Sequence, residues 1–148
     1  MRLLRSLVPF ALGAVAVLVT GAAFNKQQSD VQYIGNGGIL SSAVKVGNTL
    51  YLSGMLGTSG ERGITPETKA AMERIKTLLE ANGSHMDDVV KCTVFLADFA
   101  EWGAMNQVYT TYFTKHRPAR SAIAVAGMSG NARVEVECIA VIGARNAG

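Results

Sequence analysis

Arg120 is the residue of this sequence whose type and position best fit chemistry on a small molecule. It follows Pro118 and Ala119 at a point where a strand is expected to begin. A guanidinium beside a loop that proline stiffens can bind a carboxylate through two parallel hydrogen bonds. The spacing alone leaves one alternative open, in which Arg120 is an ordinary solvated arginine on the surface.

Glu137 is the second candidate, because it lies in a strand-like apolar segment, residues 134–142. Apolar neighbours disfavour the charged form of a carboxyl group, whereas a nearby arginine favours it, so Glu137 is a candidate general acid or base. A structural ion pair is the alternative. Ser53, which precedes Gly54, and Asn106 are weaker candidates.

Several classes of site have no counterpart in the sequence. It contains no glycine-rich phosphate loop, no hydrolase serine elbow and no dinucleotide-binding fingerprint. Its cysteines and histidines are not spaced as metal ligands. His85 and His116 lie far apart, and each is expected to be a solvated loop residue.

A hairpin near the N-terminus is the first clear element. Residues 31–34 favour a short strand before it. Residues 43–46 and 49–53 then flank Gly47-Asn48, and two turn residues of this kind suit a tight hairpin turn. The glycine-rich residues that follow are expected to form a loop.

A first helix is expected from Thr65 as N-cap and Pro66, which suits the first helical position. Gly83 is its stop signal. Four apolar residues between them share one helical face: Ala71, Ile75, Leu78 and Leu79. The β-branched residues 89–96 predict a mostly buried strand. With the hairpin and the helix it makes a β-α-β unit, which implies a parallel crossover.

A second helix is expected after Asp98, with Glu101 three positions later completing a capping pattern. An apolar stripe along this helix is interpreted as core rather than as a cofactor site: Trp102, Met105, Tyr109, Tyr112 and Phe113. Residues 121–126 predict a short strand, and residues 134–142 predict the last one.

The last strand has two different faces, because successive side chains alternate. One face is wholly apolar and is expected to pack under the two helices: Val134, Val136, Cys138, Ala140 and Ile142. The other face carries Glu135, Glu137, Ile139 and Val141. Since two helices normally cover only one face of a sheet, the second face is expected to meet another subunit.

The N-terminus has the pattern of a targeting segment. Arg2 and Arg5 precede an apolar run without a charge, and the small residues 21–23 suit cleavage after Ala23. The run is also just long enough to span a bilayer, so an uncleaved membrane anchor is the alternative.

The chain is therefore divided into three parts. Residues 1–23 are a signal peptide or membrane anchor, residues 24–30 a linker, and residues 31–148 one exported domain, expected in the periplasm or elsewhere outside the cytoplasm. The formal net charge of +3 falls to about +1 without Arg2 and Arg5, with 12 basic against 11 acidic residues. Such a small charge disfavours nucleic acid as a partner.

Cys92 and Cys138 have two possible states. Export makes a disulfide between them possible. Because both lie in strand-like apolar runs, we expect instead two buried thiols that pack as small apolar residues.

Five segments of the chain resemble the RidA family, also called YjgF/YER057c/UK114. They follow the family's order over nearly the whole domain: residues 43–48 with Ser53-Gly54, residues 87–91 with 93–96, Asn106 with residues 108–109 and 112–113, Pro118-Ala119-Arg120-Ser121, and residues 134–137 with 139–141.

The resemblance implies a chorismate-mutase-like α+β fold, with a β-β-α-β-α-β-β mixed sheet and two helices on one face. It implies a homotrimer with ligand clefts between subunits. The implied activity is hydrolysis of reactive 2-imino and enamine acids, such as 2-aminoacrylate and its imino tautomer 2-iminopropanoate, to 2-keto acids and ammonia. No metal or organic cofactor is implied, because an imine carbon is already electrophilic.

The resemblance also implies roles for individual residues. Arg120 would bind the substrate carboxylate, and Glu137 would position or activate the attacking water and shuttle protons. The main-chain carbonyl of Ala122 would help to hold that water. Ser53 and Asn106 would line the cleft.

Two departures from the family bear on the substrate. Leu40 stands where the family has a cleft tyrosine, so a polar contact is lost and the pocket becomes more apolar. The loop after Gly54 is altered, with Met55 where glutamine is common. A non-catalytic trimeric binder of small carboxylates or apolar metabolites is therefore the alternative function. RNA cleavage, also attached to some family members, is disfavoured by the near-neutral domain and by export.

Overall fold

The computed structural model describes residues 30–35, 38–58 and 60–146 of the chain. The predicted targeting segment, residues 1–23, and all but the last residue of the predicted linker lie outside the described residues. Among the described residues, no helix is long and apolar enough to cross a membrane.

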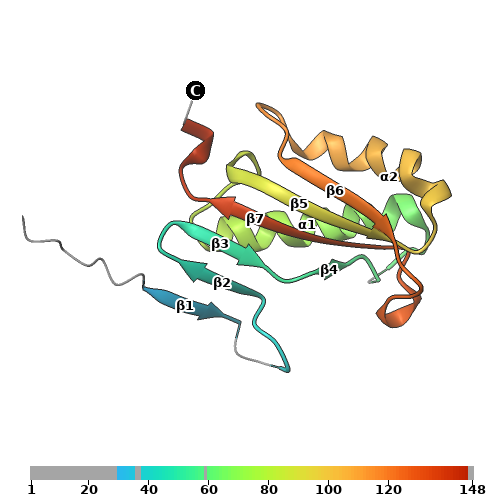
Figure 1. Ribbon diagram of the computed structural model, residues 1–148, viewed down its shortest axis with the longest axis horizontal. Helices are drawn as coiled ribbons and strands as arrows, with labels where there is room; N and C mark the ends of the chain where they lie inside the picture. Colours follow the sequence, from blue (N-terminus) through green and yellow to red (C-terminus); the bar gives the residue numbers. More distant parts are fainter. Residues whose placement is uncertain (1–29, 36–37, 59, 147–148) are drawn as a thin grey trace, which may run out of the picture.

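One mixed sheet forms the body of the protein (Figure 1). Its strands are β1 (Val31–Ile34), β2 (Ala43–Val46), β3 (Thr49–Leu52), β4 (Met55–Leu56), β5 (Val89–Leu96), β6 (Ala119–Ala124) and β7 (Val134–Val141). They are ordered β1-β2-β3-β7-β5-β6, with β4 also paired to β7. Among these described strands, only β5 and β6 pair in parallel. The predicted hairpin is confirmed as β2 and β3, with Gly47 at a φ of 57° in its turn.

One element of the predicted sheet was wrong. The segment after Gly54 was expected to be only a loop, yet it includes β4, because its backbone pairs with β7. The predicted parallel crossover from the hairpin through the first helix is confirmed, because β3 and β5 run in the same direction, but the two strands are not neighbours. β7 lies between β3 and β5 and is antiparallel to both. The parallel neighbours are instead β5 and β6, which the second helix connects.

Both helices, α1 (Ile64–Ala81) and α2 (Trp102–Tyr109), cover the same face of the sheet (Figure 1). Five short 3-10 turns complete the described structure: η1 (Met86–Asp88), η2 (Phe99–Glu101), η3 (Thr110–Tyr112), η4 (Ser129–Asn131) and η5 (Ala144–Asn146). The core lies between sheet and helices. It includes Met72, Ile75 and Leu79 of α1 and Met105 of α2, all fully buried.

Acidic side chains form contacts that correct the predicted helix caps. Gly63, not Thr65, is the N-cap of α1. Its N–H donates to Oε1 of the buried Glu67 at 3.2 Å, so the helix starts earlier than predicted. Asp98 accepts from the N–H of Ala100 at 2.9 Å and caps η2 rather than α2. Glu101 completes no capping box, because its carboxylate pairs with Arg133 at 2.6 Å.

The two predicted faces of β7 are confirmed. Val134, Val136, Cys138 and Ala140 on the helix-covered face are at most 2% exposed. The opposite face carries Glu135, Glu137, Ile139 and Val141, which are partly buried or exposed, and no helix of the described residues covers it. We call it the open face of the sheet.

Cys92 and Cys138 form a disulfide, so the prediction of two free thiols was wrong. The two residues are directly opposed in the antiparallel pairing of β5 with β7, and their Cα atoms are 4.1 Å apart. Both side chains point to the helix-covered face, where they are at most 2% exposed. The apolar pattern of each strand predicted cysteines that pack as small residues. The pattern does not contain the register between β5 and β7, and this register brings the two sulfur atoms together.

Removal of this disulfide is expected to lower the free energy of unfolding by about 2–4 kcal/mol. The link closes a loop between residues that are 46 positions apart, which restricts the unfolded chain. Urea unfolding of the double variant Cys92→Ala/Cys138→Ala measures the loss, and reduced wild-type protein is its control. A double variant as stable as the oxidised protein would contradict the expectation.

Two buried aspartates hold the start of β5 in place. Asp88 is 0% exposed and accepts hydrogen bonds from Ser84 Oγ at 3.1 Å, from the N–H of His85 at 3.0 Å and from the N–H of Arg145 at 2.9 Å. The Arg145 guanidinium also binds its carboxylate. Asp87 accepts from the N–H and hydroxyl of Thr114, at 3.1 and 2.9 Å. These bonds join the start of β5 to the C-terminal turn and to the segment after α2.

The same contacts predict acid lability. Burial acts to raise the pKa of Asp87 and Asp88, but the hydrogen bonds to each carboxylate outweigh it, and both pKa values are lowered. A folded-state pKa below the unfolded value gives stability that is present at neutral pH and lost as pH falls below about 4. Unfolding free energies between pH 7 and pH 3 should show this fall. Asp88→Asn should show a shallower dependence on pH, and an unchanged slope would exclude Asp88 as its source.

Candidate functional site

Arg120 lies on β6 at the position paired with Cys92, so its side chain rises on the helix-covered face beside α2. Its Nη1 donates to Oδ1 of Asn106 at 2.6 Å. Its Cζ lies 4.7 Å from the ring centre of Tyr109 and 5.9 Å from that of Trp102. Arg120 and Asn106, predicted as site residues from separate segments, are therefore brought together.

Tyr109 presents the face of a neutral ring to this guanidinium. Burial raises the pKa of Tyr109 to about 12, although the nearby charge of Arg120 acts to lower it. The ring is 4% exposed, and its hydroxyl finds no hydrogen-bond partner among the described residues. Attraction between a cation and an aromatic face is worth about 0.5–2 kcal/mol and restricts where the cation lies.

The partners of Arg120 are all neutral, which separates it from the ion-paired arginines of the structure. Arg62, Arg133 and Arg145 each contact a carboxylate, from Glu67, Glu101 and Asp88 respectively. Within the described part of the chain, Arg120 forms no such pair. Its charge is therefore fixed in place by an amide and two rings but is not neutralised, as a carboxylate-binding arginine requires.

The stripe on the second helix is only partly core, which corrects the prediction. Met105, Tyr109 and Phe113 are buried. Trp102 is 42% exposed, because it occupies the first position of α2, where it lies beside Arg120 and stacks on the exposed Phe99. Trp102 is thus a residue of the site that the helical pattern alone assigned to the core.

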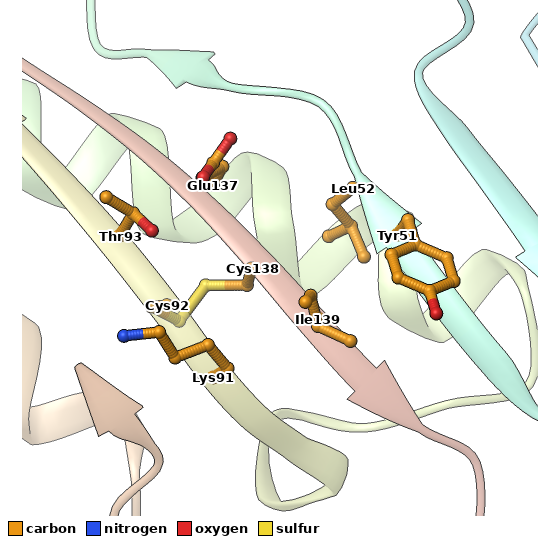
Figure 2. A pocket seen from close by; sticks show the side chains of 8 residues that line it. All are labelled: Tyr51, Leu52, Lys91, Cys92, Thr93, Glu137, Cys138 and Ile139. Atoms are coloured by element: carbon orange, nitrogen blue, oxygen red, sulfur yellow. A yellow bond between two sulfur atoms is a disulfide. The ribbon is translucent and has the colours of Figure 1, made fainter. Parts of the chain in front are cut away.

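Glu137 lies on the other side of the sheet from Arg120. It is paired with Thr93 on the open face, where it borders a hollow of about 210 Å³ between β3, β7 and β5 (Figure 2). This hollow is lined by Tyr51, Leu52, Lys91, Cys92, Thr93, Glu137, Cys138 and Ile139. Within one protomer, the structure does not bring Glu137 and Arg120 together.

Glu135 is a second carboxylate on the open face, and it was not among the predicted site residues. A Cβ added to Gly54 would lie 1.8 Å from its Oε1, so the carboxylate occupies space that only glycine leaves free, directly after Ser53. Glu135 also borders a smaller hollow of about 160 Å³ with Phe95 and Met128. The feature that identifies Glu135 as a site candidate is the pairing of β4 with β7, in which Leu56 lies opposite Glu135.

The remaining predicted site residues are dispersed. Ser53 donates its hydroxyl to the carbonyl of Ser41 at 2.6 Å, so it braces the segment before β2. Leu40 is 60% exposed in that segment. Ala122 lies two residues after Arg120 on β6, on the same face, and packs against the core.

Comparison with known proteins shows the family to which this chain belongs. A sequence profile described as Endoribonuclease L-PSP matches residues 34–142. The 2-iminobutanoate/2-iminopropanoate deaminase of Mus musculus is 42% identical over 112 residues, which cover 72% of this chain and 83% of the relative. Reactive Intermediate Deaminase A, chloroplastic, of Arabidopsis thaliana is 37% identical over 111 residues, covering 71% of this chain and 59% of the relative.

Solved structures agree. RidA from an Antarctic Psychrobacter species matches with a TM-score of 0.69 at 35% identity, covering 76% of this chain and 98% of that one. Yeast Mmf1 matches with a TM-score of 0.71 at 29% identity, with the same two coverages. The fold is therefore the α+β, chorismate-mutase-like fold of these proteins. The chain belongs to the RidA/YjgF family, and the resemblance found in the sequence is confirmed.

Proposed function

We propose that this protein is a deaminase that hydrolyses reactive 2-imino and enamine acids to 2-keto acids and ammonia. The observation that carries the proposal is Arg120, a guanidinium oriented by Asn106, Tyr109 and Trp102, which no carboxylate of the described residues neutralises. Relatives near 40% identity are named 2-iminobutanoate/2-iminopropanoate deaminases, which supports this substrate class. The carboxylate of an imino acid is the group that Arg120 would bind.

The chemistry needs one water and no change of oxidation state. The water oxygen bonds to the electrophilic imine carbon, the carbon–nitrogen bond breaks, and nitrogen leaves as ammonia with both protons of the water. A nearby carboxylate accelerates this by accepting a proton from water and returning it to the leaving nitrogen. In this reaction the protein would orient the substrate through Arg120, and a carboxylate of the protein would hold and transfer that proton.

The proposal includes an assembly of several copies, with the site between them. Arg120 and the carboxylates of β7 lie on opposite faces of one protomer, so a ligand that touches both needs a second copy. The open face supports this, because it exposes Tyr51 at 48% and Ile123 at 47%. We propose a homotrimer with clefts between subunits, in line with the expectation from the family.

Two carboxylates compete for the proton-transfer role. Glu137 was predicted for it and borders the larger open-face hollow. Glu135 lies against Gly54, next to Ser53, which is the segment proposed to line the cleft. We propose Glu135 as an equal candidate for the proton-transfer role. A matched pair of substitutions, one at each glutamate, decides between them.

Purified residues 24–148 should accelerate the decay of 2-iminopropanoate, generated from alanine by an amino-acid oxidase. Arg120→Ala should reduce kcat/KM on the order of a hundredfold, because it removes a bidentate, charge-assisted anchor. Arg120→Lys should restore only part of the loss, since an ammonium cannot form the fork. Unaccelerated decay, or full activity in Arg120→Ala, would refute the proposal.

Glu135→Gln and Glu137→Gln form the matched pair within this assay, because each keeps the side chain's size and removes only its charge and its proton-accepting capacity. The catalytic glutamate should lose about 10²–10⁴-fold in kcat. The other variant serves as its control.

We further propose that the protein works outside the cytoplasm. Besides the N-terminal pattern, the Cys92–Cys138 disulfide supports this, because such bonds persist in oxidising compartments and are rare in the cytosol. Protein isolated from its source should begin at Phe24 if cleavage follows Ala23. Retention of Met1 in a membrane fraction would support the anchor instead, and full-length protein in the cytosolic fraction would refute export.

Leu40 favours the alternative of a non-catalytic binder. It is 60% exposed and has no hydroxyl to offer a ligand, unlike the tyrosine expected there. Calorimetric binding of pyruvate without turnover of any imine would support this alternative. RNA cleavage, which the profile's description suggests, is not proposed, because the charge of about +1 calculated for the domain offers little attraction for phosphates.

A further inference from the structure

Phe99 and Trp102 form an exposed aromatic pair next to the proposed carboxylate anchor. Their ring centres are 6.5 Å apart and their planes are inclined by 28°, so the rings are stacked. Phe99 is 53% exposed and Trp102 is 42% exposed. Large aromatic rings are costly to leave in water, so a stacked, exposed pair beside a charged group has the composition of a ligand platform.

The distances place this pair within reach of a substrate side chain. The Trp102 ring centre is 5.9 Å from Cζ of Arg120. Charge-assisted hydrogen bonds of about 2.8 Å hold a bound carboxylate close to the guanidinium. A methyl substituent on the next carbon leaves most of the aromatic surface exposed. A longer apolar side chain can cover it.

We propose that Phe99 and Trp102 bind the side chain of the substrate, and that the preferred substrates are 2-imino acids with large apolar or aromatic side chains. The inference rests on the proposed deaminase function for its chemistry. Each buried methylene is worth about fourfold in affinity. A branched or aromatic side chain should therefore be preferred over a methyl by tenfold or more.

A purely structural role for Trp102 makes a different prediction. If the ring only holds the Arg120 guanidinium, its removal should weaken all substrates alike, because every substrate uses the same carboxylate anchor. If it also binds side chains, the loss should fall on large substrates. Selectivity across a substrate series, rather than the size of any one loss, therefore separates the two roles.

The first experiment measures kcat/KM for imines generated in situ from alanine, leucine and phenylalanine. The wild-type protein should prefer the leucine and phenylalanine imines by at least about tenfold. Phe99→Ala should lose about tenfold on these two imines and remain within about threefold on the alanine imine. Trp102→Ala also removes a ring beside Arg120, so it should lose activity on all three imines, with an additional loss of about tenfold on the leucine and phenylalanine imines. Gln107 is exposed on the same helix as Trp102, so Gln107→Ala is the control. It should change kcat/KM for none of the three imines. Equal losses on all three imines, or no preference in the wild type, would overturn the inference.

The second experiment does not depend on turnover. Trp102 is the single tryptophan of the chain, so its fluorescence reports on this place alone. Titration with 4-methyl-2-oxopentanoate should change the emission at a concentration at least tenfold lower than pyruvate, and Phe99→Ala should remove that difference. If no imine is hydrolysed but this preference is found, the proposed function fails and the side-chain-binding role of Phe99 and Trp102 stands. If imines are hydrolysed and both keto acids bind equally, the inference fails alone.

Discussion

The antiparallel pairing of β7 with β5 determines where the candidate functional groups lie. β7 is in the middle of the sheet, with β3 and β4 on one side and β5 on the other. In the observed register Cys138 opposes Cys92, and Glu137 opposes Thr93. Because successive residues point to opposite faces, this register places the disulfide under the helices and the carboxylates of β7 on the open face. A slip of one residue would exchange the two sets.

The same register explains why a single protomer holds only half of the proposed chemistry. β6 pairs with β5 so that Arg120 stands beside Cys92 and shares the helix-covered side with the disulfide. The anchor and the carboxylates are therefore separated by the sheet itself, and no side-chain rotation brings them together. Apolar side chains on the open face, such as Ile123 and Tyr51, make contact with another copy favourable. The proposed assembly is thus tied to the proposed catalysis.

Local patterns were enough to predict most of the fold. The short β-branched run located β5 to the residue, and the Gly47-Asn48 turn located the hairpin. Local patterns could not predict features that depend on contacts between residues distant in sequence. The disulfide joins positions 46 apart. The place of Glu135 beside Gly54 follows from the pairing of β4 with β7. The apolar stripe in the sequence identifies one face of α2. How far along that face the core extends depends on tertiary packing, which leaves Trp102 outside the core.

Arg120 illustrates how the protein holds a charge without neutralising it. A carboxylate partner would have fixed the guanidinium more strongly, as it does for Arg145, but it would also have occupied the fork that a ligand needs. An amide oxygen and two aromatic faces restrict the side chain while leaving its charge uncompensated. The buried Tyr109 ring also gives one side of the guanidinium a less polar neighbour than water, which strengthens the attraction of the guanidinium for an anion. The aromatic neighbours therefore contribute to the site through their position, their low polarity and their neutrality.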